Sequence, residues 1–326
     1  MNVTWISRLS IDPILVLMSS NDEALIYHSQ RDLLDKHVLS IDSLWHLPDA
    51  VRLVKKQQPD GHWKHSGSCN PSVPDQNYSL WETFRNLRVL VEMFGFNRSH
   101  PAIEKTAEYI LSCQTDEGDI RGIIGNQYMP YYHGVILELL IKAGYEDDPR
   151  VIKGLEWLLT VRQNDGGWII PTQSIPTKDR TNEFWSGKPV PSDRSRPHSH
   201  VATGMVLRSF AVHPSYRRLP EVLIAARCLK ERLFKADEYN DRREPSYWLK
   251  FQFPFLWTSL VSALDTLSLV GLTPDDPYIY RGLSWFIDNQ QNDGLWPTGY
   301  EKGSKSESSR RWVGLAICRI LNRYIL

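Results

Sequence analysis

Aromatic and imidazole side chains stand where apolar segments with helical spacing begin. Aromatic rings bind apolar chains, and their electron-rich faces stabilise cations, including a carbocation. If the segments are helices that start at one end of the molecule, these side chains meet there as an aromatic mouth for a hydrophobic substrate. The residues selected as substrate-binding candidates for this reason are Trp81, Tyr132, His133, His198, Trp257 and Trp312, with Trp248 and Phe253 from the chain just before Trp257. The alternative is ordinary packing of rings at helix starts.

Basic residues close to these positions could bind an anionic part of the same substrate. Arg310 and Arg311 lie in a charged segment directly before Trp312, where guanidinium groups and free helix N–H groups suit a diphosphate. A solvated surface loop is the alternative for this segment. Arg85 and Arg208 complete the set of basic binding candidates.

Asp265 and His200 are the candidate catalytic residues. Asp265 lies eight residues after Trp257, and Arg208 lies eight residues after His200. Residues eight apart in a helix share nearly the same face, which predicts that Arg208 and Asp265 form an ion pair beneath the mouth. An aspartate beside arginine stays ionised, so Asp265 would serve better as a counter-ion for a developing cation than as an acid. The alternative is a structural clasp between two helices.

Two histidines separated by one residue, His198 and His200, could also ligate a metal ion, with His133 or Cys69 as a further ligand. Their spacing is not a known zinc pattern. Histidines that form hydrogen bonds within a loop are the favoured interpretation, and we predict neither a metal nor a cofactor.

The positions of these residues depend on a repeat. Four segments combine helical spacing, a glutamine and a turn that contains glycine, and they end at Trp63, Ile120, Trp168 and Trp296; a degenerate copy spans residues 225–239. Glycine adopts the left-handed conformation that ends helices. We expect the glutamine to bond the loose carbonyl groups at the helix end and the tryptophan to pack back on the helix that it follows.

Each turn is followed by a second, more apolar helix. The predicted ranges are 81–95, 133–144, 200–212, 257–271 and 312–321. Helices this apolar must be buried on most sides, which a ring of about five to six hairpins with the apolar helices inside achieves. An open superhelix would need polar faces on both sides. We therefore predict one all-α domain over residues 1–326, with repeats from about residue 50 and with helices from residues 1–45 completing the ring.

Composition narrows the functional classes. Lys+Arg and Asp+Glu number 38 each, so the formal net charge of zero argues against a nucleic-acid-binding protein. Arg8 and Asp12 interrupt the apolar start, which disfavours a signal peptide, and the chain has no stretch typical of a spanning helix. The four cysteines form no CxxC pair and suggest free thiols. We expect a cytoplasmic protein, with peripheral membrane contact compatible with these features; the oligomeric state is not predicted.

The Gln-x-Asp-Gly-x-Trp units that end at Trp63, Trp168 and Trp296 resemble the QW repeats of squalene and oxidosqualene cyclases. The resemblance implies the α/α toroid that those cyclases share with protein prenyltransferase β subunits, and an isoprenoid ligand. The chain departs from both families, because it has neither the Asp-x-Asp-Asp acid motif of the cyclases nor the Asp-x-Cys zinc pair of the prenyltransferases. It resembles the lone toroid of prokaryotic cyclase-like proteins.

Three functions are compatible with these sequence features. The preferred one is an enzyme that acts on an isoprenoid by cyclisation or prenyl transfer. The missing acid motif favours the second, a non-catalytic protein that binds an isoprenoid or another lipid. The third is a carbohydrate-active toroid, which would need paired carboxylates where the inner helices offer only Glu82 and Asp75.

Overall fold

The computed structural model describes residues 5–68, 73, 75–239, 242–299 and 304–324, with the backbone alone at 304–306. These residues form helices and isolated bridges but no strand. The inner helices are α2 (Glu23–Leu33), α4 (Tyr78–Phe94), α6 (Pro130–Leu140), α9 (His200–Val212), α11 (Leu260–Leu269) and α13 (Ser304–Arg323). The outer helices are α1 (Pro13–Met18), α3 (Pro48–Val54), α5 (Pro101–Ser112), α7 (Pro149–Thr160), α10 (Pro220–Glu231) and α12 (Pro277–Asp288). The short α8 (Asn182–Ser186) comes between α7 and α9 along the chain.

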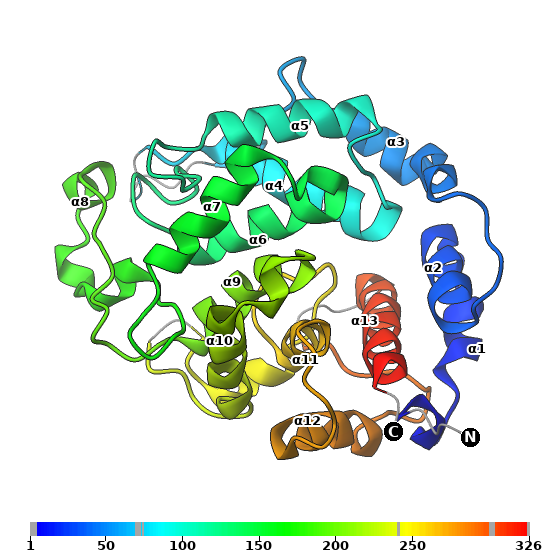
Figure 1. Cartoon of the computed structure of the whole chain (residues 1–326). Coiled ribbons are helices and arrows are strands. Elements are labelled where there is room, and N and C mark those ends of the chain that lie inside the picture. The colour runs from blue at the N-terminus through cyan, green and yellow to red at the C-terminus, as the bar shows by residue number, and fades with distance from the viewer. Residues whose placement is uncertain (1–4, 69–72, 74, 240–241, 300–303, 325–326) are drawn as a thin grey trace.

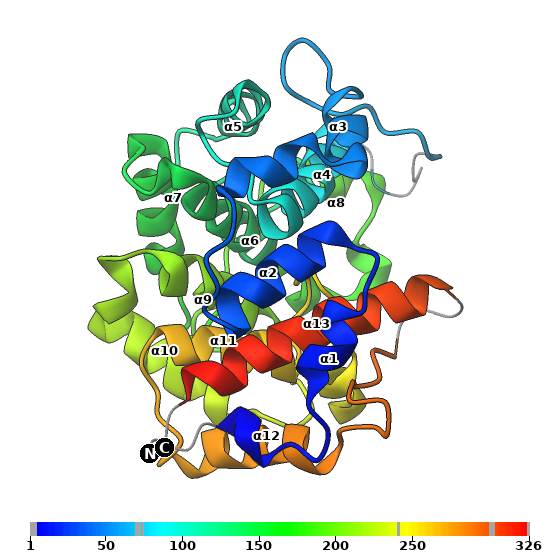
Figure 2. The same ribbon diagram turned by 90° about the vertical axis from the view of Figure 1, so that its right-hand side faces the viewer.

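The inner helices form a closed ring (Figures 1 and 2). Contacts run from α4 through α6, α9, α11 and α13 to α2, and α2 in turn contacts α4. Every outer helix contacts at least one inner helix, so a second layer surrounds the ring. The predicted all-α toroid is confirmed. No described helix has both the length and the apolar character that a bilayer crossing requires.

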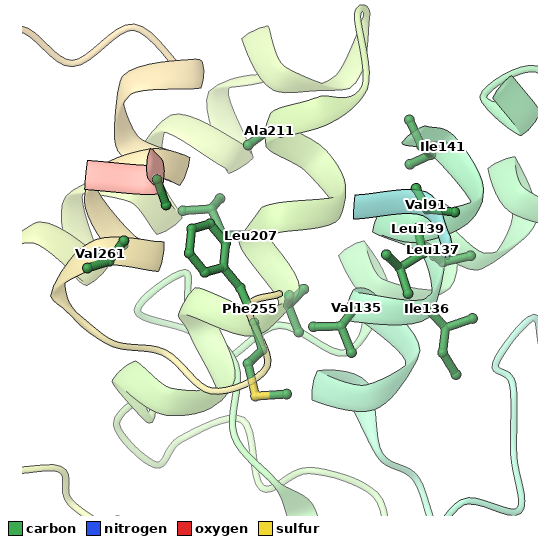
Figure 3. Close-up of a cluster of buried hydrophobic side chains, with 14 of the residues drawn as sticks. Val91, Val135, Ile136, Leu137, Leu139, Ile141, Leu207, Ala211, Phe255 and Val261 are labelled. Carbon is green, nitrogen blue, oxygen red and sulfur yellow. The ribbon is translucent and has the colours of Figure 1, made fainter. Parts of the chain in front are cut away.

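Burial of the apolar helices explains the ring. Every residue of α6 is buried, as is every residue of α9 from His200 to Ala211. Gly134 allows these two helices to approach closely, because a Cβ atom there would lie 2.7 Å from the Cα of Val206. Figure 3 shows side chains of both helices in the core, with Val135 and Leu137 from α6 and Leu207 from α9.

The glutamines of the repeat connect neighbouring hairpins. Gln57 Nε2 donates to the carbonyl of the turn residue Gly61 at 3.0 Å and to that of Ala102 in α5 at 2.8 Å. Gln114 Nε2 donates in the same way to the carbonyl groups of Gly118 in its turn and of Arg150 in α7. The expectation that glutamine would bond the end of its own helix is wrong for Gln114, whose side chain points to the turn and to the next outer helix. In the first copy, the neighbouring Gln58 donates from Nε2 to the Lys56 carbonyl, just after α3, at 3.2 Å.

The tryptophans of the repeat donate hydrogen bonds to the end of the helix that precedes each turn. The indole Nε1 of Trp63, Trp168 and Trp296 each donates at 2.8 Å to a carbonyl ten residues earlier, in α3, α7 and α12 respectively. The predicted packing of tryptophan on the preceding helix is confirmed. In the degenerate copy, Trp248 Nε1 donates at 2.9 Å to the carbonyl of Lys235, which lies four residues after the end of α10.

The turn glycines yield a first testable result. Gly166 has φ of 103° and Gly271 has φ of 91°, so a side chain at either position costs about 1–2 kcal/mol. A Cβ atom at Gly166 would also lie 2.3 Å from Ile224 Cγ2, whereas nothing lies within 4 Å of one at Gly271. We expect Gly166→Val to lower the free energy of unfolding more than Gly271→Val in a denaturant titration. Equal losses would show that the contact with Ile224 relaxes freely.

Candidate functional site

Five aromatic side chains gather at the N-terminal ends of inner helices and are called the aromatic group: Trp81, Phe84, Tyr131, Tyr132 and Trp257. The ring centroids of Trp81 and Tyr132 are 5.4 Å apart in an edge-to-face arrangement, and those of Tyr132 and Trp257 are 6.2 Å apart. Trp81 and Trp257 are half-buried, whereas the two tyrosines are buried. The structure thus brings together Trp81, Tyr132 and Trp257, whose binding role stays a prediction.

The long segment between α10 and α11 reaches the aromatic group. The guanidinium carbon of Arg242 lies 4.2 Å from the centroid of the Trp257 ring and 5.2 Å from that of Tyr247. The face of Trp257 therefore accommodates a cation in this structure.

Three other aromatic candidates lie in the packing between elements. Trp312 is 2% exposed, and its Nε1 donates to Asp22 Oδ2 at 2.8 Å, which ties α13 to the start of α2. Phe253 stacks on Trp312 with a centroid distance of 5.4 Å. Trp248 is buried and stacks on His200, whose Nδ1 lies 2.9 Å from Asp237 Oδ2. These contacts leave Trp312 and Trp248 almost no surface for a ligand.

The histidines do not converge. His133 accepts a hydrogen bond from the Ile120 N–H at Nδ1 and donates from Nε2 to the Gly154 carbonyl, so it links α6 to α7. His200 faces Asp237, and His198 contacts Asp165 instead. The less favoured hypothesis that His198, His200 and His133 together bind a metal ion is therefore wrong. Cys69, the other ligand considered, lies outside the described residues.

Arg310 and Arg311 occupy a different setting from the one expected. The helix α13 begins at Ser304, so both residues lie inside the helix, where free N–H groups are not available. Arg310 donates to the Trp296 carbonyl and to Asp293, and Arg311 donates to the Val16 carbonyl and to Glu307. Both arginines hold protein segments together.

Arg85 and Arg208 also have acidic partners. Arg85 contacts Glu82 at 3.1 Å on the surface of α4. Arg208 Nη2 lies 2.6 Å from Glu138 Oε2, although not in hydrogen-bonding geometry. Asp265 pairs with Arg323 of α13.

The predicted ion pair between Arg208 and Asp265 is therefore wrong. Trp257 lies before α11, which begins at Leu260, so its spacing to Asp265 is not helical. In α9, the eight residues from His200 to Arg208 turn the helix by two turns and about 80° more, so the two side chains point in different directions. The α6 and α9 helices approach closely at Gly134, and Arg208 of α9 contacts Glu138 of α6 across the same interface.

Glu138 anchors a charged network inside the ring. Lys142 Nζ donates to Glu138 at 2.7 Å and to Glu92 at 2.6 Å. Burial alone would raise the pKa of Glu138, but Arg208 and Lys142 outweigh it and lower that pKa. The carboxylate is thus ionised at neutral pH. The sequence signal for this network was a set of charged residues inside the most apolar helices, of which the site prediction used Arg208 but neither Glu138 nor Lys142.

Arg88 lies beside this network with part of its guanidinium unsatisfied. Its Nε and Nη1 are buried and have no hydrogen-bond partner among the described residues. Burial and, to a smaller extent, repulsion from Arg208 lower the pKa of Arg88 to about 10. Its guanidinium carbon lies 5.8 Å from the ring centroid of Phe84, so Arg88 adjoins the aromatic group.

A polar cavity of about 520 Å³ opens at the opposite end of the ring, between the C-terminal ends of α2, α4 and α13. Arg31 and Arg319 line it, and both contact Asp32 at 2.5 Å. His28 also lines the cavity. Burial and, to a smaller extent, the charges of Arg319 and Arg31 lower the pKa of His28 to about 3, so its side chain is neutral. The cations here complement the partial negative charge of the helix ends.

Comparison with known proteins finds a family match for the central segment. Residues 83–194 match the squalene-hopene cyclase C-terminal domain. The resemblance to the terpenoid cyclase superfamily that the repeats indicate is thereby confirmed, and the match covers most of α4 and continues through α7 and α8. None of the curated proteins matches the chain.

Solved structures also resemble this terpenoid cyclase-like chain. A protein from Actinoplanes is 16% identical with a TM-score of 0.45, and 87% of each chain is covered. The type II terpene cyclase MstE from Scytonema is 13% identical with a TM-score of 0.33, over 86% of this chain and 96% of that chain. A glycosyl hydrolase family 88 protein from Bacteroides vulgatus is 13% identical with a TM-score of 0.41, over 87% of each chain.

Proposed function

We propose that this terpenoid cyclase-like chain binds a hydrophobic, isoprenoid-type ligand at the aromatic group. The observation that carries the proposal is the convergence of rings from α4, α6 and the segment before α11, with Trp81 and Trp257 still half-exposed. Such rings offer an apolar surface for a branched hydrocarbon chain. The match to the squalene-hopene cyclase C-terminal domain supports the same ligand class.

The contact of Arg242 with Trp257 supports a further property of this site. The Arg242 guanidinium covers the indole face at 4.2 Å from the ring centroid, which supports a face that attracts a positive group. An isoprenoid would compete with Arg242 for this face, so the segment that carries Arg242 would move when the ligand binds.

The charged residues favour binding over proton-initiated cyclisation. Protonation of an alkene needs a carboxyl group that keeps its proton, yet the charges of Arg208 and Lys142 lower the pKa of the buried Glu138. Of the two candidate catalytic residues, Asp265 contacts Arg323 and His200 faces Asp237. We propose that Asp265 and Glu138 act as fixed counter-charges and that the chain holds its ligand without cyclising it.

The binding site can be tested with farnesol as the probe, measured by native mass spectrometry. We expect Trp257→Ala to weaken the apparent affinity by about 5- to 30-fold, because removal of a stacked ring costs on the order of 1–2 kcal/mol of contact. Trp285→Ala is the matched control, since Trp285 is also half-buried but lies on the outer helix α12.

Thermal unfolding of both variants separates binding from folding. Equal farnesol affinity in Trp257→Ala and the wild type would overturn the assignment of the aromatic group. Arg242→Ala adds an opposite expectation, because removing the guanidinium from the Trp257 face should strengthen farnesol binding.

A further inference from the structure

A cluster of potential metal ligands lies on the outer side of the ring, beside α7 and α10, and the proposed function does not use it. Asp165 belongs to the turn after α7, His198 lies two residues before α9, and Cys228 belongs to α10. One ligand atom from each residue lies within 4.8 Å of the other two. Imidazole, thiolate and carboxylate are the ligand types that Zn²⁺ takes in proteins.

The folded turn fixes the positions of these groups. Asp165 Oδ2 accepts hydrogen bonds from the backbone N–H of His198 at 2.8 Å and from its Nδ1 at 2.9 Å. Asp165 Oδ1 accepts from the Gly167 N–H at 3.1 Å, and the Cys228 thiol donates to the Asp165 carbonyl at 3.2 Å. The three side chains are therefore held together before any ion binds.

The second ring nitrogen of His198 adds an independent observation. His198 Nε2 is buried and has no hydrogen-bond partner among the described residues. A buried nitrogen without a partner costs free energy, and coordination of a metal ion by His198 Nε2 would remove this cost.

We propose that Asp165, His198 and Cys228 form a Zn²⁺ site. The Asp165 side chain is 37% exposed, so solvent has access to the fourth coordination position. Binding releases the thiol proton of Cys228 to solvent, and the imidazole coordinates through a nitrogen that carries no proton. The ion ties α10 to the turn after α7 and to the start of α9, which makes it a clip across three segments.

Cobalt replaces zinc as a visible probe for the test. The full chain, reduced and freed of metal with a chelator, is titrated with Co²⁺ and followed by the thiolate-to-cobalt charge-transfer absorption. We expect one equivalent of Co²⁺ to produce this band and Zn²⁺ to abolish it. Cys228→Ser and His198→Gln should lower the affinity by about tenfold or more.

Two variants serve as matched controls. His62 pairs with Asp60 at 2.7 Å in the equivalent turn of the first repeat, where the described residues include no metal-ligand cluster, so His62→Gln should leave cobalt binding unchanged. Cys113→Ser removes another half-buried thiol and should also have no effect.

Stability gives a second measurement. Zn²⁺ should raise the melting temperature of the wild type, because it binds the folded state, and should not raise that of His198→Gln. The absence of a charge-transfer band in the wild type would overturn the proposal. A band that persists in Cys228→Ser, or one that disappears in Cys113→Ser, would also overturn it. If Cys228→Ser does not fold, His198→Gln decides alone.

Discussion

Replacing Arg208 by leucine is expected to lower the free energy of unfolding by about 3–5 kcal/mol, measured by denaturant titration. Glu138 is 1% exposed, and Arg208 lies 2.6 Å from its carboxylate. Without Arg208, the buried Glu138 carboxylate has Lys142 as its remaining cationic partner, and Lys142 also contacts Glu92. The variant also removes the hydrogen bonds that Arg208 donates to the carbonyl groups of Phe255 and Leu256.

The double variant Arg208→Leu with Glu138→Leu tests whether the loss comes from the unpaired charge. It should cost clearly less than the sum of the two single changes, because both partners are removed together. Arg85→Leu is the control, since its contact with Glu82 is on the surface and contributes less than about 1 kcal/mol. Strictly additive losses would mean that Arg208 and Glu138 do not stabilise each other.

Acid should destabilise the fold between about pH 6.5 and pH 4 through His133. Burial lowers the pKa of His133 from 6.5 to about 4, although the Gly154 carbonyl and Asp119 oppose the shift. The unfolded chain therefore binds a proton in this window while the folded chain does not, so stability falls as the pH falls. A group shifted this far contributes on the order of 3 kcal/mol, and His28, whose pKa is about 3, acts in the same direction.

Denaturant titrations at several pH values measure this effect. His133→Asn should flatten the pH dependence, because it keeps an acceptor for the Ile120 N–H but cannot be protonated. The control His37→Gln changes an exposed histidine and should leave the slope unchanged. If His133→Asn kept the full slope of the wild type between pH 6.5 and pH 4, the neutral buried state of His133 would be incorrect.

Local sequence patterns were sufficient to predict the parts of the fold that depend on short spacing. The Asp-Gly turns, the tryptophans that bond a carbonyl ten residues earlier and the alternation of polar with apolar helices are all set within one repeat. The same spacing placed Trp81, Tyr132 and Trp257 at helix starts, and the ring brought them together. We propose that the closed ring of α2 to α13 is the single domain expected from these repeats.

The partners of the charged and metal-ligating side chains depend instead on how the complete ring packs. Arg208 contacts Glu138 instead of Asp265. Asp165, His198 and Cys228 meet although they lie 33 and 30 positions apart in the sequence. Helical spacing fixes how deep a residue lies along an axis. The rotation of the helix and the distance to its neighbours depend on side-chain packing across the whole ring, such as the close approach at Gly134, and no local pattern encodes them.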